Sequence, residues 1–105
     1  MKSAEIISYF LQFTNNLKIY HWNTLIYARH KASDKLLTKL NPLIDLFVES
    51  YMGKYGKLSP IEDIKNINVN DNNVKVKLIN PFVKFLRKLT VEMKDDEELS
   101  HLCHE

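Results

Sequence analysis

The sequence predicts an all-α fold, and two observations support this prediction. Glycine occurs only at positions 53 and 56, and apolar residues recur at helical rather than strand spacing along most of the 105 residues. A chain of this length can bury one modest core. We therefore expect a single domain over residues 1–105, one small enough to favour docking to other chains.

The first predicted helix runs from Ser3 to about Asn23. Ser3 is a suitable N-cap, and Glu5 places a negative charge in the first turn, where it favours the helix dipole. Apolar residues then follow at spacings of four, three and four, which line one helical face: Ile6, Phe10, Phe13 and Leu17.

The second predicted helix begins near Tyr27 or Ala28, and we expect Gly53 and Gly56 to end it. Pro42 lies inside this helix, where it removes one hydrogen bond, so we expect a bend rather than a break. The predicted apolar face consists of Leu36, Leu40, Leu43, Phe47 and Tyr51.

The remaining chain predicts a short connecting helix, a third helix and a truncated fourth. Ser59 and Pro60 have the residue types of a helix start. Residues 67–77, INVNDNNVKVK, allow either a hairpin with a turn at NDNN or the start of a helix. The longer pattern favours a helix that bends at Pro81, because its apolar residues repeat at spacings of four, four, three, four and four: Val74, Leu78, Phe82, Phe85, Leu89 and Met93. From Asp95 the chain is acidic and resembles the first turns of a fourth helix.

Composition limits the classes of function. The 15 basic and 13 acidic residues give a formal net charge of +2, and they are interspersed, so nucleic acid is not indicated as a partner. Polar residues such as Gln12 and Lys18 interrupt every apolar stretch before the roughly 18 positions that a membrane span needs, and no signal peptide is evident. The single cysteine, Cys103, cannot form an intramolecular disulfide. We therefore expect a soluble cytoplasmic or otherwise intracellular protein.

Four side chains of the second predicted helix have the chemistry of metal ligands. His30 and Asp34 lie one turn apart, as do Asp45 and Glu49, and all four fall within about 100° of one face. The two pairs are about 16 Å apart along the helix axis, which is too far for one metal ion to bridge. One helix therefore cannot form this site by itself.

A two-fold symmetric partner can complete the site. If the same helix of a second chain packs antiparallel, His30 and Asp34 of one chain lie opposite Asp45 and Glu49 of the other, which gives two equivalent sites per dimer. His21, at the end of the first helix, lies beside the same corner. Imidazole and carboxylate ligands suit iron, zinc or manganese.

These residues resemble a motif of the mini-ferritins, the family of DNA-binding proteins from starved cells. The similarity is carried by HWN at 21–23, HKASD at 30–34 and DLFVE at 45–49. It implies a ferritin-like antiparallel helical bundle that forms a homo-oligomer through the second helix. The family's ferroxidase centre implies that His21, His30 and Asp34 bind iron together with Asp45 and Glu49 of a neighbouring subunit. Trp22 then lies close by as a redox-active or packing aromatic.

The sequence is also similar to small ferritin-like proteins encoded by giant DNA viruses. This second similarity implies a location in the virion and other virion proteins as partners. The main alternative to an iron-oxidising protein is therefore a non-enzymatic structural or interaction protein built on the same helical fold. In that case Asp34, Asp45 and Glu49 form the solvated face of an amphipathic helix, and Trp22 is a core or interface residue.

A second group of possible ligands lies near the C-terminus. Glu98 and His101 have the Glu-x-x-His spacing of di-iron helical bundles, and His104 and Glu105 follow around Cys103. Because such pairs arise easily in an acidic segment, we favour a charged helix end here. The sequence contains no Gly-rich phosphate loop and no nucleophile elbow, so nucleophilic catalysis has no support.

Overall fold

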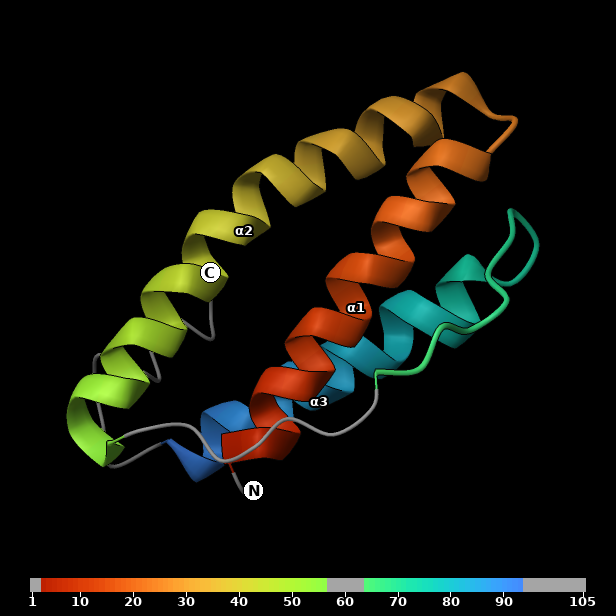
Figure 1. The fold of residues 1–105 in the computed structure, drawn as a ribbon. Coiled ribbons are helices and arrows are strands. Elements are labelled where there is room, and N and C mark those ends of the chain that lie inside the picture. The colour runs from red at the N-terminus through yellow and green to blue at the C-terminus, as the bar shows by residue number, and fades with distance from the viewer. Residues whose placement is uncertain (1–2, 57–63, 94–105) are drawn as a thin grey trace.

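The computed structural model describes residues 3–56 and 64–93. The order of elements is α1 (Ser3–Asn23), α2 (Tyr27–Tyr55), the π-helical segment η1 (Lys75–Ile79) and α3 (Asn80–Glu92) (Figure 1). The described residues contain no strand, which confirms the all-α prediction and the helical alternative for the region after Asn73. The connecting helix predicted at 59–63 and the fourth helix predicted from Asp95 lie outside the described residues.

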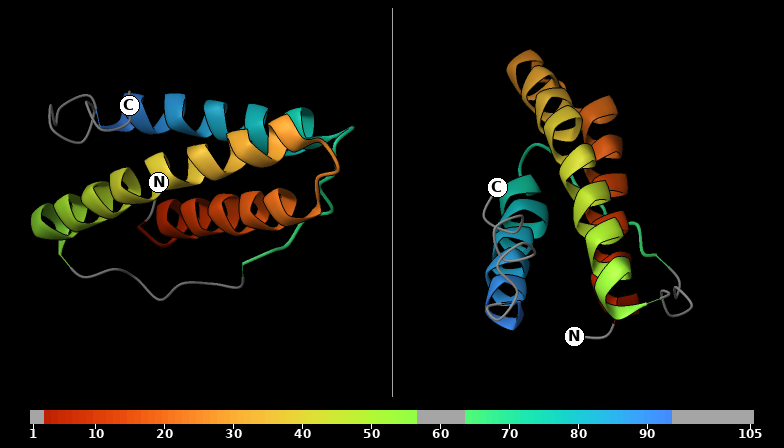
Figure 2. Two further views of the ribbon diagram at one scale, coloured as in Figure 1. Left: turned by 90° about the horizontal axis from the view of Figure 1, so that it is seen from above. Right: turned by 90° about the vertical axis from the view of Figure 1, so that its left-hand side faces the viewer.

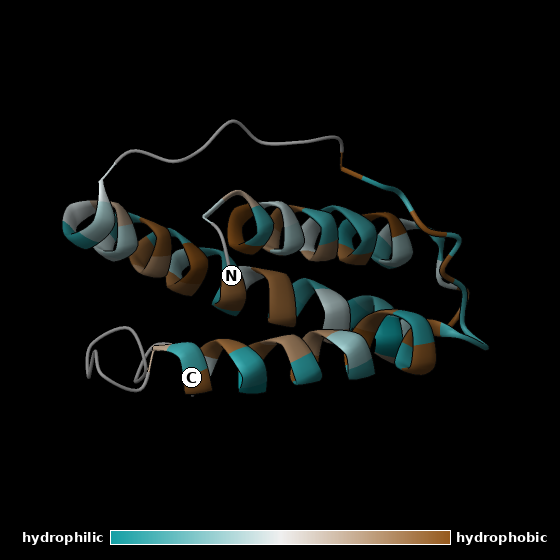
Figure 3. Ribbon diagram, turned by 90° about the horizontal axis from the view of Figure 1, so that it is seen from below, coloured by the Kyte–Doolittle hydropathy of each residue, from teal (hydrophilic) through white to brown (hydrophobic). Residues whose placement is uncertain are grey.

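Helix α1 lies at the centre of the molecule. Helix α2 packs against it in antiparallel orientation, and the two views of Figure 2 place α3 on one side of α1 and residues 64–70 on the other. Brown and teal alternate along the helices in Figure 3, which is the pattern of amphipathic helices that each bury one face. No helix among the described residues is long and apolar enough to cross a membrane.

Aromatic side chains of α1 and α3 form most of the core between these two helices. The rings of Phe13 and Phe82 stack at a centroid distance of 3.7 Å, and those of Tyr9 and Phe85 at 4.2 Å. Phe10 contacts Phe85 edge-on at 5.3 Å. Such offset and edge-on pairs add about 1 kcal/mol each to the free energy gained from area burial. The predicted stripe of α1 is buried as a whole: Ile6, Phe10, Phe13 and Leu17.

The buried face of α2 differs from the predicted one. Leu36 is 38% exposed, whereas its neighbour Leu37 is buried. Leu40, Leu43 and Tyr51 are half-buried and Phe47 is buried, so the prediction was wrong at its first position. The core therefore meets α2 along a line rotated slightly from the predicted stripe, with Ser33, Leu37, Ile44 and Val48 on it.

The two glycines near the end of α2 have different roles. Gly53 lies inside the helix, so the prediction that both glycines end it was wrong for this residue. Gly56 ends it with a φ of 86°, a left-handed conformation that favours glycine, and its N–H donates to the Met52 carbonyl. Pro42 does not interrupt the helix. It lies on the exposed side, where water can bond the carbonyl that its missing N–H leaves unpaired.

Asn70 and Asn73 begin the helical segment that leads into α3. The Asn70 side-chain oxygen accepts hydrogen bonds from the backbone N–H groups of Asn72 (2.9 Å) and Asn73 (3.0 Å), while the Asn73 side-chain oxygen accepts from the Asn70 N–H (2.7 Å). This reciprocal arrangement is a capping box with asparagine in place of the usual glutamate. The NDNN sequence is thus a helix start and not a hairpin turn.

Pro81 explains why the helix begins with π-helical geometry. Its ring has no N–H and clashes with the carbonyl four residues back, at Lys77, in a regular α-helix. The wider turn of η1, in which the Asn80 N–H donates to the Lys75 carbonyl, relieves this conflict just before the proline. At the position of the predicted bend, the structure has a π-helical segment that ends just before Pro81.

Asn16 attaches residues 64–70 to α1. Its side chain is 1% exposed and donates to the carbonyls of Gln12 (2.7 Å) and Lys65 (3.2 Å), while its oxygen accepts from the Ile67 N–H (2.9 Å). Ile67 and Val69 then pack against the core. This buried amide fixes the segment that leads to the capping box, and through it the position of Asp71.

Candidate functional site

The corner between α1 and α2 brings His21 and His30 into direct contact. Their rings stack at a centroid distance of 4.0 Å with an interplanar angle of 19°. His21 Nδ1 lies 2.7 Å from the His30 carbonyl, and His30 Nδ1 lies 2.8 Å from the His21 carbonyl. Each ring thus bonds the backbone of the other histidine, and the pair closes the corner.

These contacts determine the tautomer of both rings. A carbonyl oxygen only accepts hydrogen bonds, so each Nδ1 must carry a proton and donate it. In the neutral ring the lone pair then lies on Nε2. Metal-binding histidines have this arrangement, in which one ring nitrogen donates to a carbonyl or carboxylate and the other coordinates the ion. The Nδ1 contacts of this pair are thus of the kind that metal-binding histidines make with their non-coordinating nitrogen.

Ser33 supports the histidine pair from α2. Its hydroxyl is buried, lies 2.9 Å from His21 Nδ1 and donates to the Arg29 carbonyl at 2.8 Å. The contact fixes the His21 ring from the α2 side. No sequence signal marks this role, because a serine in HKASD is equally suited to a solvent-exposed helix position.

Asp71 holds the same corner from the opposite side. One carboxylate oxygen accepts hydrogen bonds from the hydroxyls of Tyr20 (2.8 Å) and Thr24, and the other accepts from the Leu25 N–H (3.2 Å). Arg29 donates to the Asp71 carbonyl at 2.5 Å and lies 3.7 Å from the carboxylate. A single aspartate thus joins the end of α1, the corner and the first turn of α2.

The surroundings of Asp71 favour its charged form. The hydrogen bond from Thr24 contributes most to holding the pKa of this carboxyl below its ordinary value of 3.8. Hydrogen bonds from Tyr20 and the Leu25 amide and the charge of Arg29 act in the same direction, while desolvation opposes them. The carboxylate is therefore ionised at neutral pH, as its contacts require.

The predicted carboxylate ligands are placed on α2 but are not gathered within one chain. Asp34, Asp45 and Glu49 are all exposed. Asp34 lies one turn beyond His30, whereas Asp45 and Glu49 line a shallow hollow of about 230 Å³ against Ile7 and Leu11 of α1. The described part of one chain holds no group of three or more His, Cys, Asp or Glu side chains placed to bind a metal ion. The described part of one chain therefore does not bring the five predicted ligands together, and their completion by a second chain stays a prediction.

The exposed corner also carries apolar side chains. Trp22 is 65% exposed, so it is not a core residue, and its ring lies 5.6 Å from Lys18 Nζ. Leu25 is 95% exposed and Tyr27 is 70% exposed. This apolar corner, which we define as Trp22, Leu25, Ile26 and Tyr27, is available for contact with another chain.

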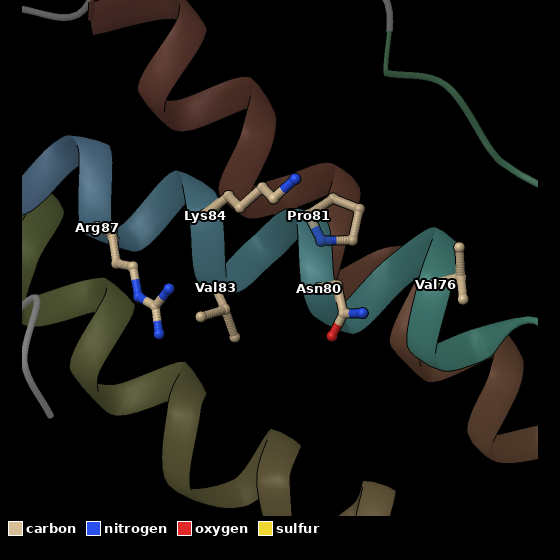
Figure 4. Close-up of a pocket in the computed structure, with 6 residues that line it drawn as sticks. All are labelled: Val76, Asn80, Pro81, Val83, Lys84 and Arg87. Atoms are coloured by element: carbon tan, nitrogen blue, oxygen red, sulfur yellow. The ribbon is translucent and has the colours of Figure 1, made fainter.

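A larger hollow of about 540 Å³ lies on the outer side of η1 and α3 (Figure 4). Its described lining comes from one helical segment only, with Val76, Asn80 and Val83 beside the basic side chains of Lys84 and Arg87. In Figure 4 the side chains of Asn80, Val83 and Arg87 point to the same side. The alternative ligand group of Glu98, His101, His104 and Glu105 lies outside the described residues.

Fold and site together define a class: an all-helical protein whose two N-terminal helices are joined by a corner with paired histidines. Comparison of its sequence with known protein families assigns the chain to a narrower group. Residues 21–105 match DUF5856, a family of unknown function, and the chain belongs to this family. The matched range includes all five predicted ligands. Neither the curated protein sequences nor the solved structures provide a significant match.

Proposed function

We propose that the protein binds ferrous iron between two copies of the chain and oxidises it with peroxide or oxygen. The observation that carries the proposal is the His21–His30 pair, because its two Nδ1–H groups donate to backbone carbonyls, so that each neutral ring has its lone pair on Nε2, the nitrogen with which histidines in this arrangement coordinate metal. Asp34 lies one turn from His30. Asp45 and Glu49 of a second, antiparallel α2 supply the remaining oxygen ligands.

Iron is the substrate of this reaction, and the side chains supply its coordination. Two ferrous ions give up one electron each to hydrogen peroxide, which takes up two protons and becomes two molecules of water. The carboxylates stabilise the higher charge of the ferric product. The similarity to the mini-ferritins supports this choice of substrate.

The proposal is tested by adding ferrous iron anaerobically to the purified protein and then peroxide, and measuring bound metal and ferric absorbance. Replacing both Asp45 and Glu49 by alanine should abolish protein-dependent oxidation and leave helicity by circular dichroism unchanged. Glu5→Ala is the matched control, since it removes an exposed carboxylate of α1 outside the site. Normal oxidation by the double variant would disprove the proposal.

A second candidate function is that of a structural or interaction protein. The apolar corner favours it, because exposed tryptophan and tyrosine side chains are typical of protein contacts. In this case the protein binds no iron above background, and replacing Trp22 and Leu25 by alanine changes its association state in light scattering. A discrete iron-binding homo-oligomer that this double variant leaves unchanged would exclude this candidate.

A further inference from the structure

An open hollow of about 270 Å³, called the cavity below, lies between α1, α2 and η1. Its floor is formed by Leu17 and Tyr20 of α1, which are buried in the core, and by Ser33 of α2. Apolar side chains form the walls, among them Leu36 of α2 and Ile79 of η1. Leu36, which the predicted apolar stripe placed in the core, is instead 38% exposed and borders this cavity.

The charged residues that line this cavity are both cations. The Arg29 guanidinium donates a hydrogen bond to the Asp71 carbonyl. The Asp71 carboxylate oxygens accept from Tyr20, Thr24 and the Leu25 amide. Lys75 is exposed and has no carboxylate partner within the described parts of the chain. No carboxylate is among the described lining residues. The cavity thus combines an open apolar surface with the positive charge of Lys75 at its edge, a combination that suits an apolar ligand with a negatively charged head.

We propose that this cavity binds a small organic monoanion with an unbranched apolar chain, of the medium-chain carboxylate class. The chain lies along the Leu17, Leu36 and Ile79 side chains, and the carboxylate pairs with Lys75, with Arg29 as a second donor. Apolar walls of this extent exclude inorganic phosphate as the preferred ligand, because it has no apolar surface to bury. The inference does not depend on iron, since it uses neither Asp45 nor Glu49.

The test uses octanoate as the probe and octyltrimethylammonium as the head-group control. Both are titrated into the ¹⁵N-labelled full chain, and the shifts of backbone amide signals give the affinity and the place of binding. Octanoate should move the amides of Ala32, Ser33 and Ile79 and bind at least about tenfold tighter than the cation, which corresponds to about 1.4 kcal/mol. Equal affinity for octanoate and octyltrimethylammonium would by itself overturn the proposal.

Two charge-reversal variants locate the anion. Lys75→Glu should weaken octanoate binding by roughly tenfold or more, as expected for losing a charge-assisted hydrogen bond. Lys84→Glu makes the same change in charge on the neighbouring hollow of Figure 4 and should leave the affinity within about twofold. An equal loss in both variants would show attraction to a generally basic surface, and a loss in Lys84→Glu alone would move the site to the other hollow. Either result contradicts the proposal.

A third variant tests the cavity itself. Ala32 lines it from an exposed position on α2, so Ala32→Phe should fill the space without disturbing the core. We expect octanoate binding to fall by about tenfold or more while the melting temperature stays close to that of the parent. Unchanged binding in a folded Ala32→Phe variant would show that octanoate binds elsewhere.

Discussion

Among single residues, the buried Asn16 stabilises the fold through three side-chain hydrogen bonds. Asn16→Ala leaves the Ile67 N–H and the Lys65 carbonyl without their partner beneath a packed segment. Because an unsatisfied buried polar group costs about 1–3 kcal/mol, we expect a loss of about 2 kcal/mol in the free energy of unfolding, measured with urea. Asn15→Ala is the matched control, since Asn15 is exposed on the same helix and should change stability by no more than about 0.5 kcal/mol. Equal effects of the two substitutions would contradict the role assigned to Asn16.

Asp71 makes the stability of the protein depend on pH. Its pKa is lowered in the folded state, so the stabilisation is fully present above its ordinary value of 3.8 and is lost as the pH falls through the lower folded value. Asp71→Asn should therefore be less stable than the parent at pH 7, and the difference should shrink below pH 3.8. Urea unfolding of both proteins at several pH values measures this. A difference that stays constant down to the lowest pH would contradict the assigned contacts.

The candidate site shows which contacts a sequence can predict. His21 and His30 flank a corner of three residues, so local spacing alone brings them close. The Tyr20–Asp71 contact joins residues 51 apart, and no local pattern marks one aspartate as the acceptor for a distant corner. Ser33 and Asn16 were missed for the same reason, because their importance comes from the elements that pack over them.

At the scale of elements, the two glycines of α2 should respond to alanine in opposite directions. Gly56 has a φ of 86°, so Gly56→Ala should destabilise the protein by about 1 kcal/mol. Gly53 lies inside the helix, and a Cβ there meets nothing within 4 Å, so Gly53→Ala should stabilise by about 0.5–1 kcal/mol. Melting temperatures of the two variants test the pair. A destabilised Gly53→Ala variant would show that α2 ends earlier than described.

Helix positions were more predictable than helix orientations. The bounds of α1 and the start of α2 follow from apolar periodicity and from the break at residues 24–26. The exact buried face of α2 does not, because stripes through Leu36 and through Leu37 both continue at Leu40. The choice between these two stripes depends on where α1 packs and on the cavity beside η1, which Leu36 borders. The ambiguity between a hairpin and a helix at NDNN was likewise resolved by a capping box whose two asparagines must act together.

At the scale of the whole molecule, an intersubunit site predicts complementation between inactive variants. A His21→Ala/His30→Ala chain and an Asp45→Ala/Glu49→Ala chain each lack one half of every site. In a dimer of the two variants, one of the two sites has all its ligands and the other keeps only Asp34. Since random exchange makes half of the dimers mixed, an equimolar mixture should recover about a quarter of the parental iron oxidation. A mixture as inactive as its components would show that the site is not shared between subunits.

The buried Asn16 amide also has a consequence for the order of folding. Its bonds to Lys65 and Ile67 join residues 49 and 51 positions apart, so they form only after a long loop has closed, whereas the α1–α2 corner is local. We infer that residues 64–70 dock after the rate-limiting barrier, onto helices that have already paired. Asn16→Ala should then speed unfolding and leave the folding rate nearly unchanged in stopped-flow measurements. A slower folding rate would place this amide in the folding nucleus. In that case, α1 would be positioned by a contact that forms early with residues 64–70.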